Sequence, residues 1–99
     1  MNIDIQRNIP ADHPSLRGHF PGNPIVPGVV ILDEVVHALA EYHGDYELQG
    51  IPSVKFLAPL RPDQVFTIHF TVVAAHSVKF RCTADGQLFV QGQLTIAAQ

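Results

Sequence analysis

The chain contains little of what would mark a secreted, nucleic-acid-binding or membrane protein. Its single cysteine, Cys82, cannot form a disulfide within the chain, and one thiol says little about redox compartment. Lys and Arg together number six against nine Asp and Glu, and the net charge is −3. The sequence therefore has no basic stripe of the kind that binds nucleic acid. The longest apolar run, Val29–Leu32, is far too short to span a membrane.

The N-terminus also lacks the apolar core of a signal peptide, since it reads Met-Asn-Ile-Asp-Ile-Gln-Arg. We therefore expect a cytoplasmic protein. Its 99 residues predict one domain, residues 1–99, near the lower end of comfortable size. Although 46% of the residues are apolar, so short a chain cannot easily enclose both a core and a ligand cavity. Sharing the site across a dimer interface would relieve that problem.

One long helix is expected from Pro27-Gly28 to about Tyr42 or His43. Proline suits the first turn, where its missing N–H costs nothing, and Gly44 suits the end. The segment is apolar nearly all round, so other structure should wrap it. Its many β-branched residues would also suit a buried strand, but about fifteen residues is too long for a typical strand.

Strands are expected on both sides of this helix. Residues 2–9 alternate between apolar and polar, as in a half-buried strand. Four more strands are predicted after residue 48: Ser53–Pro59, Val65–Ala75, Ser77–Thr83 and Leu88–Ala97. The Asp85-Gly86 pair between the last two is a strong hairpin signal. The pattern therefore predicts an α+β fold in which an antiparallel sheet wraps around one long central apolar helix.

The segment before the helix holds most of the chemical information. Residues 10–27 contain five of the eight prolines and the histidine His19, and Asp33 follows fourteen positions later within the apolar helix. An imidazole and a carboxylate brought to one apolar place are the groups of general acid–base catalysis. Two simpler interpretations stay open: His19 could hold the Pro-Gly turn, and Asp33 with Glu34 could form an exposed helix edge.

This segment resembles the active-site loop of the β-hydroxyacyl-acyl-carrier-protein dehydratases of fatty-acid synthesis, which have the hot-dog fold. The family's loop reads roughly His-Phe-Pro-Gly-x-Pro-x-x-Pro-Gly-Val, and residues 19–29 match it at every fixed position. The family's helix acid also lies fourteen residues after the histidine, and here that position is Asp33. A second block is similar to the family's Val-Lys-Phe strand and the turn after it: Val54-Lys55-Phe56, Pro59 and Arg61-Pro62-Asp63. The resemblance covers about residues 16–65 well and the last strands only in pattern.

The resemblance implies a dehydratase that converts a 3-hydroxyacyl thioester to the trans-2-enoyl thioester in fatty-acid or specialised lipid or polyene synthesis. The substrate would be carried on acyl carrier protein or coenzyme A, with no metal or redox cofactor. The site would lie at the interface of a homodimer or a higher oligomer. His19 would take the α-proton, Asp33 would help to expel the hydroxyl as water, and the Gly28 N–H would bond the thioester carbonyl. The expected substrate-binding residues are Phe20, Pro27, Val29, His37 and Phe56.

The residue types fit this chemistry on physical grounds as well. The enolate that forms beside a thioester needs stabilising, and an N–H at a helix N-terminus supplies that. Histidine titrates near neutrality, as a base should. Apolar surroundings would favour the protonated form of Asp33 and let it act as an acid, so we expect Asp33 to be buried.

Departures from the family pattern keep other functions open. The family often has glutamine four residues after the acid, where this chain has His37, which is placed to pair with Asp33 and weaken it as a proton donor. His37 could equally be a packing histidine. The alternatives are a catalytically weak accessory subunit that grips an acyl carrier or a partner dehydratase, and a hot-dog thioesterase. Asp at position 33 also occurs in the family branch that isomerises the double bond.

The remaining side chains are expected to be structural. Cys82 should be a small buried hydrophobe. Four aromatic residues should form the core, although one or two could line an acyl tunnel: Phe66, Phe70, Phe80 and Phe89. Five basic residues could form a patch for an acidic carrier protein or be ordinary solvated strand ends: Arg17, Lys55, Arg61, Lys79 and Arg81. Four histidines lack the spacing of a metal site and are expected at the surface or in strands: His13, His43, His69 and His76.

Overall fold

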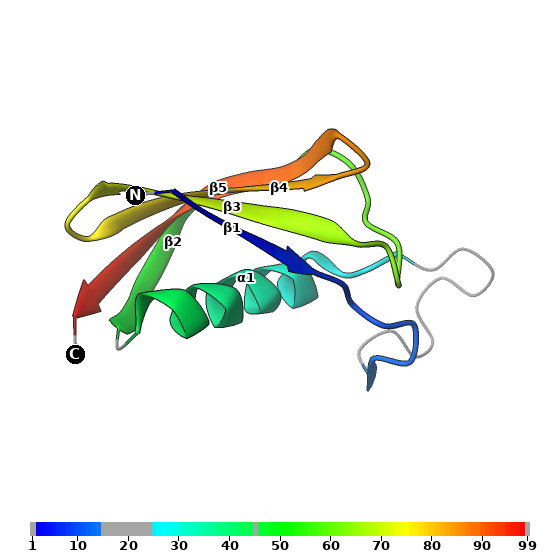
Figure 1. The fold of residues 1–99 in the computed structure, drawn as a ribbon, viewed down its shortest axis with the longest axis horizontal. Coiled ribbons are helices and arrows are strands. Elements are labelled where there is room, and N and C mark those ends of the chain that lie inside the picture. The colour runs from blue at the N-terminus through cyan, green and yellow to red at the C-terminus, as the bar shows by residue number, and fades with distance from the viewer. Residues whose placement is uncertain (1, 15–24, 45, 99) are drawn as a thin grey trace.

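The computed structural model of the chain describes residues 2–14, 25–44 and 46–98. They form one helix and one antiparallel sheet with strand order β1-β3-β4-β5-β2. The elements in chain order are β1 (Asn2–Arg7), α1 (Gly28–His43), β2 (Tyr46–Phe56), β3 (Phe66–Ala74), β4 (Ser77–Ala84) and β5 (Gln87–Ala98). The sheet curves over α1, which lies along one of its faces (Figure 1). The expected α+β arrangement of a sheet around one helix is confirmed.

The helix α1 begins and ends where the sequence predicted. Pro27 stands at the N-cap with φ −60°, and its carbonyl accepts hydrogen bonds from the N–H groups of Val30 (3.0 Å) and Ile31 (3.3 Å). At the other end Gly44 adopts φ 78°, a left-handed conformation that glycine reaches without strain. Within the described ranges, no helix is both long and apolar enough to cross a membrane.

The predicted bounds of the strand after the helix were wrong. We expected Ser53–Pro59, whereas β2 runs from Tyr46 to Phe56. Tyr46 to Gln49 do alternate between apolar and polar residues, but Gly50 and Pro52 interrupt the pattern, and the pairing with β5 shifts register on both sides of Gly50. Hydrogen bonding to β5 therefore keeps one continuous strand in the sheet across a break in its own sequence pattern. The other four strands agree with the prediction to within two residues at each end.

The turn between β4 and β5 is the tight hairpin that Asp85-Gly86 predicted. Ala84 pairs with Gln87, and the two residues between them have φ 51° and 76°. Positive φ at both central positions is the type I′ geometry, which matches the twist of paired strands. This turn starts the pairing of β4 with β5, whose register then shifts once, between Thr83 and Cys82.

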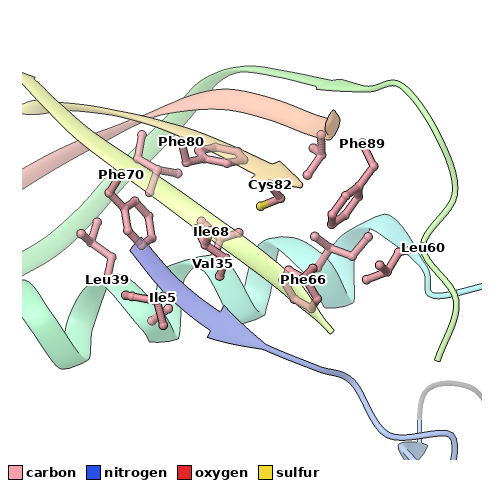
Figure 2. Close-up of a cluster of buried hydrophobic side chains, with 14 of the residues drawn as sticks. Ile5, Val35, Leu39, Leu60, Phe66, Ile68, Phe70, Phe80, Cys82 and Phe89 are labelled. Atoms are coloured by element: carbon pink, nitrogen blue, oxygen red, sulfur yellow. The ribbon is translucent and has the colours of Figure 1, made fainter. Parts of the chain in front are cut away.

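The core lies between the sheet and α1, as Figure 2 shows. Alternate residues of the central strands point toward the helix, and each is at most 2% exposed: Phe66, Ile68, Phe70, Val78, Phe80 and Cys82. From the helix, Val35 and Leu39 fill the space against them. The rings of Phe66 and Phe89 meet edge to face, with centroids 5.6 Å apart and planes at 88°. The four expected core phenylalanines and the buried cysteine are thus confirmed.

Candidate active site

The described part of the candidate site is the start of α1, the end of β2 and the exposed face of the helix. His19 and Phe20, the expected base and one expected substrate contact, lie outside the described residues. Their roles stay predictions. The acid Asp33, the helix-start residue Gly28 and the remaining expected contacts are described, and their geometry can be compared with the expectation.

Gly28 and Phe56 come together at the start of the helix. A Cβ on Gly28 would lie 2.7 Å from Cζ of the Phe56 ring, which is closer than real Cβ contacts come. Glycine at this position therefore lets the Phe56 ring lie directly over the first turn of α1, and a larger residue would push the exposed ring aside. An apolar pocket of about 530 Å³ opens beside this contact, lined among others by Ile25, Val26, Ile31, Leu57 and Leu60. Among the described substrate contacts expected from the sequence, Phe56 lines this apolar pocket, together with the helix-start residue Gly28, whereas Pro27, Val29 and His37 do not.

The first amides of α1 are oriented along the helix without an acceptor inside it. The first helical hydrogen bonds are donated by the N–H groups of Val30 and Ile31, so the N–H groups of Gly28 and Val29 have no acceptor within the helix. No side-chain hydrogen bond caps this end. Because the helix dipole is positive here, a carbonyl oxygen that gains negative charge is stabilised at these N–H groups.

The expectation that Asp33 is buried is wrong for the single chain. Its side chain is 69% exposed, because it lies on the face of α1 that points away from the sheet. Val29, one turn earlier on the same face, is 73% exposed. An apolar side chain this open beside a candidate catalytic acid marks a surface that one copy of the chain does not cover.

His37 lies one turn beyond Asp33, and the expected pairing is present. Its Nδ1 is 3.6 Å from Oδ2 of Asp33, with both side chains about two-thirds exposed. The neighbouring acid has a different environment, since Glu34 lies 3.4 Å from Nε of Arg7 on β1 and its side chain is 30% exposed. Glu34 therefore ties the helix to the edge strand, while Asp33 faces outward.

Sequence reasoning missed Arg7, which pairs with Glu34 and also with Glu41. A signal was available, because Arg7 falls on the same side of β1 as Ile3 and Ile5 and must therefore point toward the helix. Its role is to anchor α1 beneath β1.

Comparison with known proteins gives matches across most of the chain. Residues 1–93 match the profile of a family described as ApeI-like, ApeI dehydratase. A 3-hydroxyacyl-[acyl-carrier-protein] dehydratase FabZ of Chlamydia trachomatis is 34% identical over 94% of this chain, which spans 66% of that protein. A FabZ of Thermomicrobium roseum is 31% identical over 92% of this chain and 69% of its own length.

Solved structures give the same picture. A chain of the dehydratase heterocomplex ApeI:P from Xenorhabdus doucetiae superposes with a TM-score of 0.82 at 29% identity, covering 97% of this chain and 87% of that one. The (R)-hydratase of A. caviae involved in PHA biosynthesis gives a TM-score of 0.80 at 16% identity, over 100% of this chain and 95% of that one. At that identity the second likeness shows the fold alone. The hot-dog fold expected from the sequence is confirmed.

Proposed function

Because the chain belongs to the family of ApeI-like dehydratases, we propose that it removes water from a 3-hydroxyacyl thioester to give the trans-2-enoyl thioester. The observation that carries this proposal is the uncapped start of α1 at Gly28, which borders an apolar pocket beside Phe56. Relatives named as 3-hydroxyacyl-[acyl-carrier-protein] dehydratases support a substrate held on acyl carrier protein in fatty-acid or specialised lipid synthesis.

The proposed reaction uses three groups of the chain. His19 takes the α-proton, and the electron pair of the broken C–H bond moves toward the thioester carbonyl. The N–H of Gly28 stabilises the charge that develops on this oxygen. As the C–C double bond forms, the C–O bond breaks, and Asp33 gives a proton to the departing hydroxyl, which leaves as water. Exchange with solvent returns His19 to its basic form and Asp33 to its acidic form.

A second copy of the chain would supply the cover that Asp33 needs. Exposed apolar side chains surround the start of the helix, with Val29 73%, Phe56 46% and Leu57 44% exposed. We infer that a homodimer buries this surface and brings the His19 loop of one subunit to the Asp33 of the other. Sedimentation at micromolar concentration should show a dimer, and a well-behaved monomer would contradict the shared site.

A heterodimer with a partner dehydratase is the second candidate. It is favoured by the Xenorhabdus structure, which is named as a dehydratase heterocomplex, ApeI:P. In that case the chain on its own would bind an acyl carrier protein without dehydrating its acyl chain. A catalytically weak accessory subunit therefore predicts carrier binding without product, and activity that appears only when the partner is added.

The test is to incubate the purified protein with a 3-hydroxyacyl thioester of acyl carrier protein and to follow the mass of the intact carrier. Loss of one water by the wild type, but not by His19→Ala, supports the proposal. His76→Ala is the matched control, because His76 lies in the turn before β4, where its Nδ1 contacts the carbonyl of Ile96. Release of the free carrier thiol would instead identify a thioesterase, and bound but unchanged substrate the accessory subunit.

The cytoplasmic location expected from the sequence stays a prediction. Fractionation of cells that produce the untagged protein tests it, and recovery with the periplasm or the membrane would contradict it.

A further inference from the structure

Three cationic side chains gather on the face of the sheet opposite α1. In β4 the residues Val78, Phe80 and Cys82 point inward, so Lys79 and Arg81 between them point outward and are exposed. Across the sheet, Arg81 pairs with Gln91 of β5, and Gln91 pairs with Lys55 of β2. At two strand spacings, the backbones of Lys55 and Arg81 lie about 10 Å apart. Their long side chains can therefore reach one ligand between them.

The cations surround a hollow rather than a flat surface. Its volume is about 420 Å³, and polar groups without charge also line it: the hydroxyl of Ser53 and the amides of Gln91 and Gln93. The amide of Gln93 is held in place because its Nε2 donates to Oγ of Ser77. Hydroxyl and amide donors beside cations are the usual companions of a bound oxyanion.

No acid of the described residues neutralises these cations. The ion pairs in that part of the chain involve Arg7, His37 and His69, and none involves the three cations of the hollow. Asp4 lies in the same cross-strand row, two strands from Arg81 on the other side of the hollow, but its Oδ1 is 2.8 Å from Nδ1 of His69 and is engaged there. Half of the six Lys and Arg residues thus stand together, unpaired, on one face of a chain whose net charge is −3. Like charges so close repel one another, and a bound anion removes that cost.

We propose that this hollow binds a small molecule through a phosphate or diphosphate group. Arginine offers a planar pair of N–H donors to phosphate oxygens, and lysine adds a compact charge. The volume lies within the range of small-molecule sites. Because the hollow is on the face away from α1, it is separate from the proposed dehydration site, and occupancy is measured without turnover.

The test is a titration of the isotope-labelled protein with inorganic pyrophosphate at low ionic strength, followed by amide NMR. Saturable shifts are expected in residues 53–55, 79–81 and 91–93. Arg81→Gln should weaken the dissociation constant at least about tenfold. The matched control is Arg61→Gln, which removes the same charge from an exposed residue outside the hollow and should change the constant less than about twofold. Both variants should melt at the temperature of the wild type.

Two further probes identify the source of the phosphate group. Competition by inorganic phosphate alone would point to a free anion, and tighter binding of ADP than of pyrophosphate would point to a phosphorylated organic ligand. Equal weakening by Arg81→Gln and Arg61→Gln, or shifts that never saturate, would overturn the proposal in favour of general charge attraction. Binding of a poly-glutamate peptide that pyrophosphate fails to displace would overturn it in favour of an acidic protein partner.

Discussion

The imidazole of His37 lies one helical turn beyond the carboxylate of Asp33, with Nδ1 3.6 Å from Oδ2. Exposed pairs of this spacing contribute less than about 1 kcal/mol, so the contact can orient the Asp33 carboxylate but is too weak to hold it away from a substrate. We predict that His37→Gln changes the rate of dehydration by less than about tenfold, because Asp33 keeps its place on the helix. A steady-state assay measures this. A loss as large as that of Asp33→Asn would make His37 a participant in the chemistry.

The two neighbouring acids of α1 should differ in their effect on turnover. Asp33→Asn removes the proposed proton donor and should lower the rate constant at least about a hundredfold. Glu34→Gln breaks the contact with Arg7 instead, and should lower the free energy of unfolding by about 1 kcal/mol or less with little effect on rate. Turnover and urea unfolding of both variants separate the two roles. The reverse ranking would mean that the site is built on the other face of the helix.

The contact between Gly28 and Phe56 predicts a coupled pair of substitutions. Gly28→Ala places a Cβ 2.7 Å from the end of the ring, and because the exposed Phe56 side chain can turn aside, the free energy of unfolding should fall by only about 1 kcal/mol. The same substitution in a Phe56→Leu background should cost much less, because the smaller side chain leaves room. A double-mutant cycle by urea unfolding measures the coupling. Additive effects would show that the two residues do not touch in solution.

Gly92 in β5 lies under the backbone of β2. A Cβ at this position would come within 2.5 Å of the Ser53 carbonyl oxygen and 2.8 Å of the Phe80 ring. Since a paired strand cannot yield as a flexible side chain does, Gly92→Ala should lower the free energy of unfolding by about 2–3 kcal/mol. Gly50→Ala is the control, because a Cβ there would meet nothing within 4 Å, and its effect should stay within about 0.5 kcal/mol. Equal effects would contradict the close approach.

Cys82 should be chemically inert while the protein is folded. It is fully buried, and burial raises the pKa of its thiol from 9.0 to about 12. A thiol reagent at pH 8 should therefore label it only after denaturation. Above pH 9 the unfolded chain loses this proton while the folded chain keeps it until about pH 12, so the free energy of unfolding should fall through that window. Burial also raises the pKa of Tyr46, which adds to the fall.

The Cys82→Ala variant isolates the contribution of the thiol. Its free energy of unfolding should depend less on pH between 9 and 12 than that of the wild type, when both are measured by urea denaturation. An unchanged slope, or rapid labelling of the native protein at pH 8, would contradict the burial of Cys82.

Local patterns in the sequence were enough for most of the fold. The bounds of α1 follow from Pro27 and Gly44, and the β4–β5 hairpin follows from Asp85-Gly86, because these residues restrict their own backbone. The first half of β2 could not be predicted this way. Gly50 and Pro52 interrupt its alternation of apolar and polar residues, and hydrogen bonds to residues 95–98 of β5 keep it in the sheet.

The candidate site shows the same division. Gly28 and Phe56 were each expected at the site through the resemblance of two sequence blocks, but their direct contact, which the missing Cβ allows, was not predicted. The burial of Asp33 was inferred from its apolar surroundings, but of its neighbours Ile31 and Val35 turn inward, while Asp33 turns outward with Val29. Whether Asp33 is buried in an assembly depends on a second subunit, and a local sequence pattern in one chain cannot predict that.

The strand order has a consequence for how the protein is made by the ribosome. Among the five strands, β5 comes last in the sequence, yet it lies between β4 and β2 and not at an edge of the sheet. The first strand, β1, can pair only after β3 has been synthesised, since Asn2 pairs with Thr71. A nascent chain from which Gln87–Ala98 has not yet emerged therefore cannot bring β2 into the sheet. Until then the core lacks the apolar residues of β5, among them Phe89 and Leu94, and the apolar surface left open makes the unfinished sheet a target for chaperones.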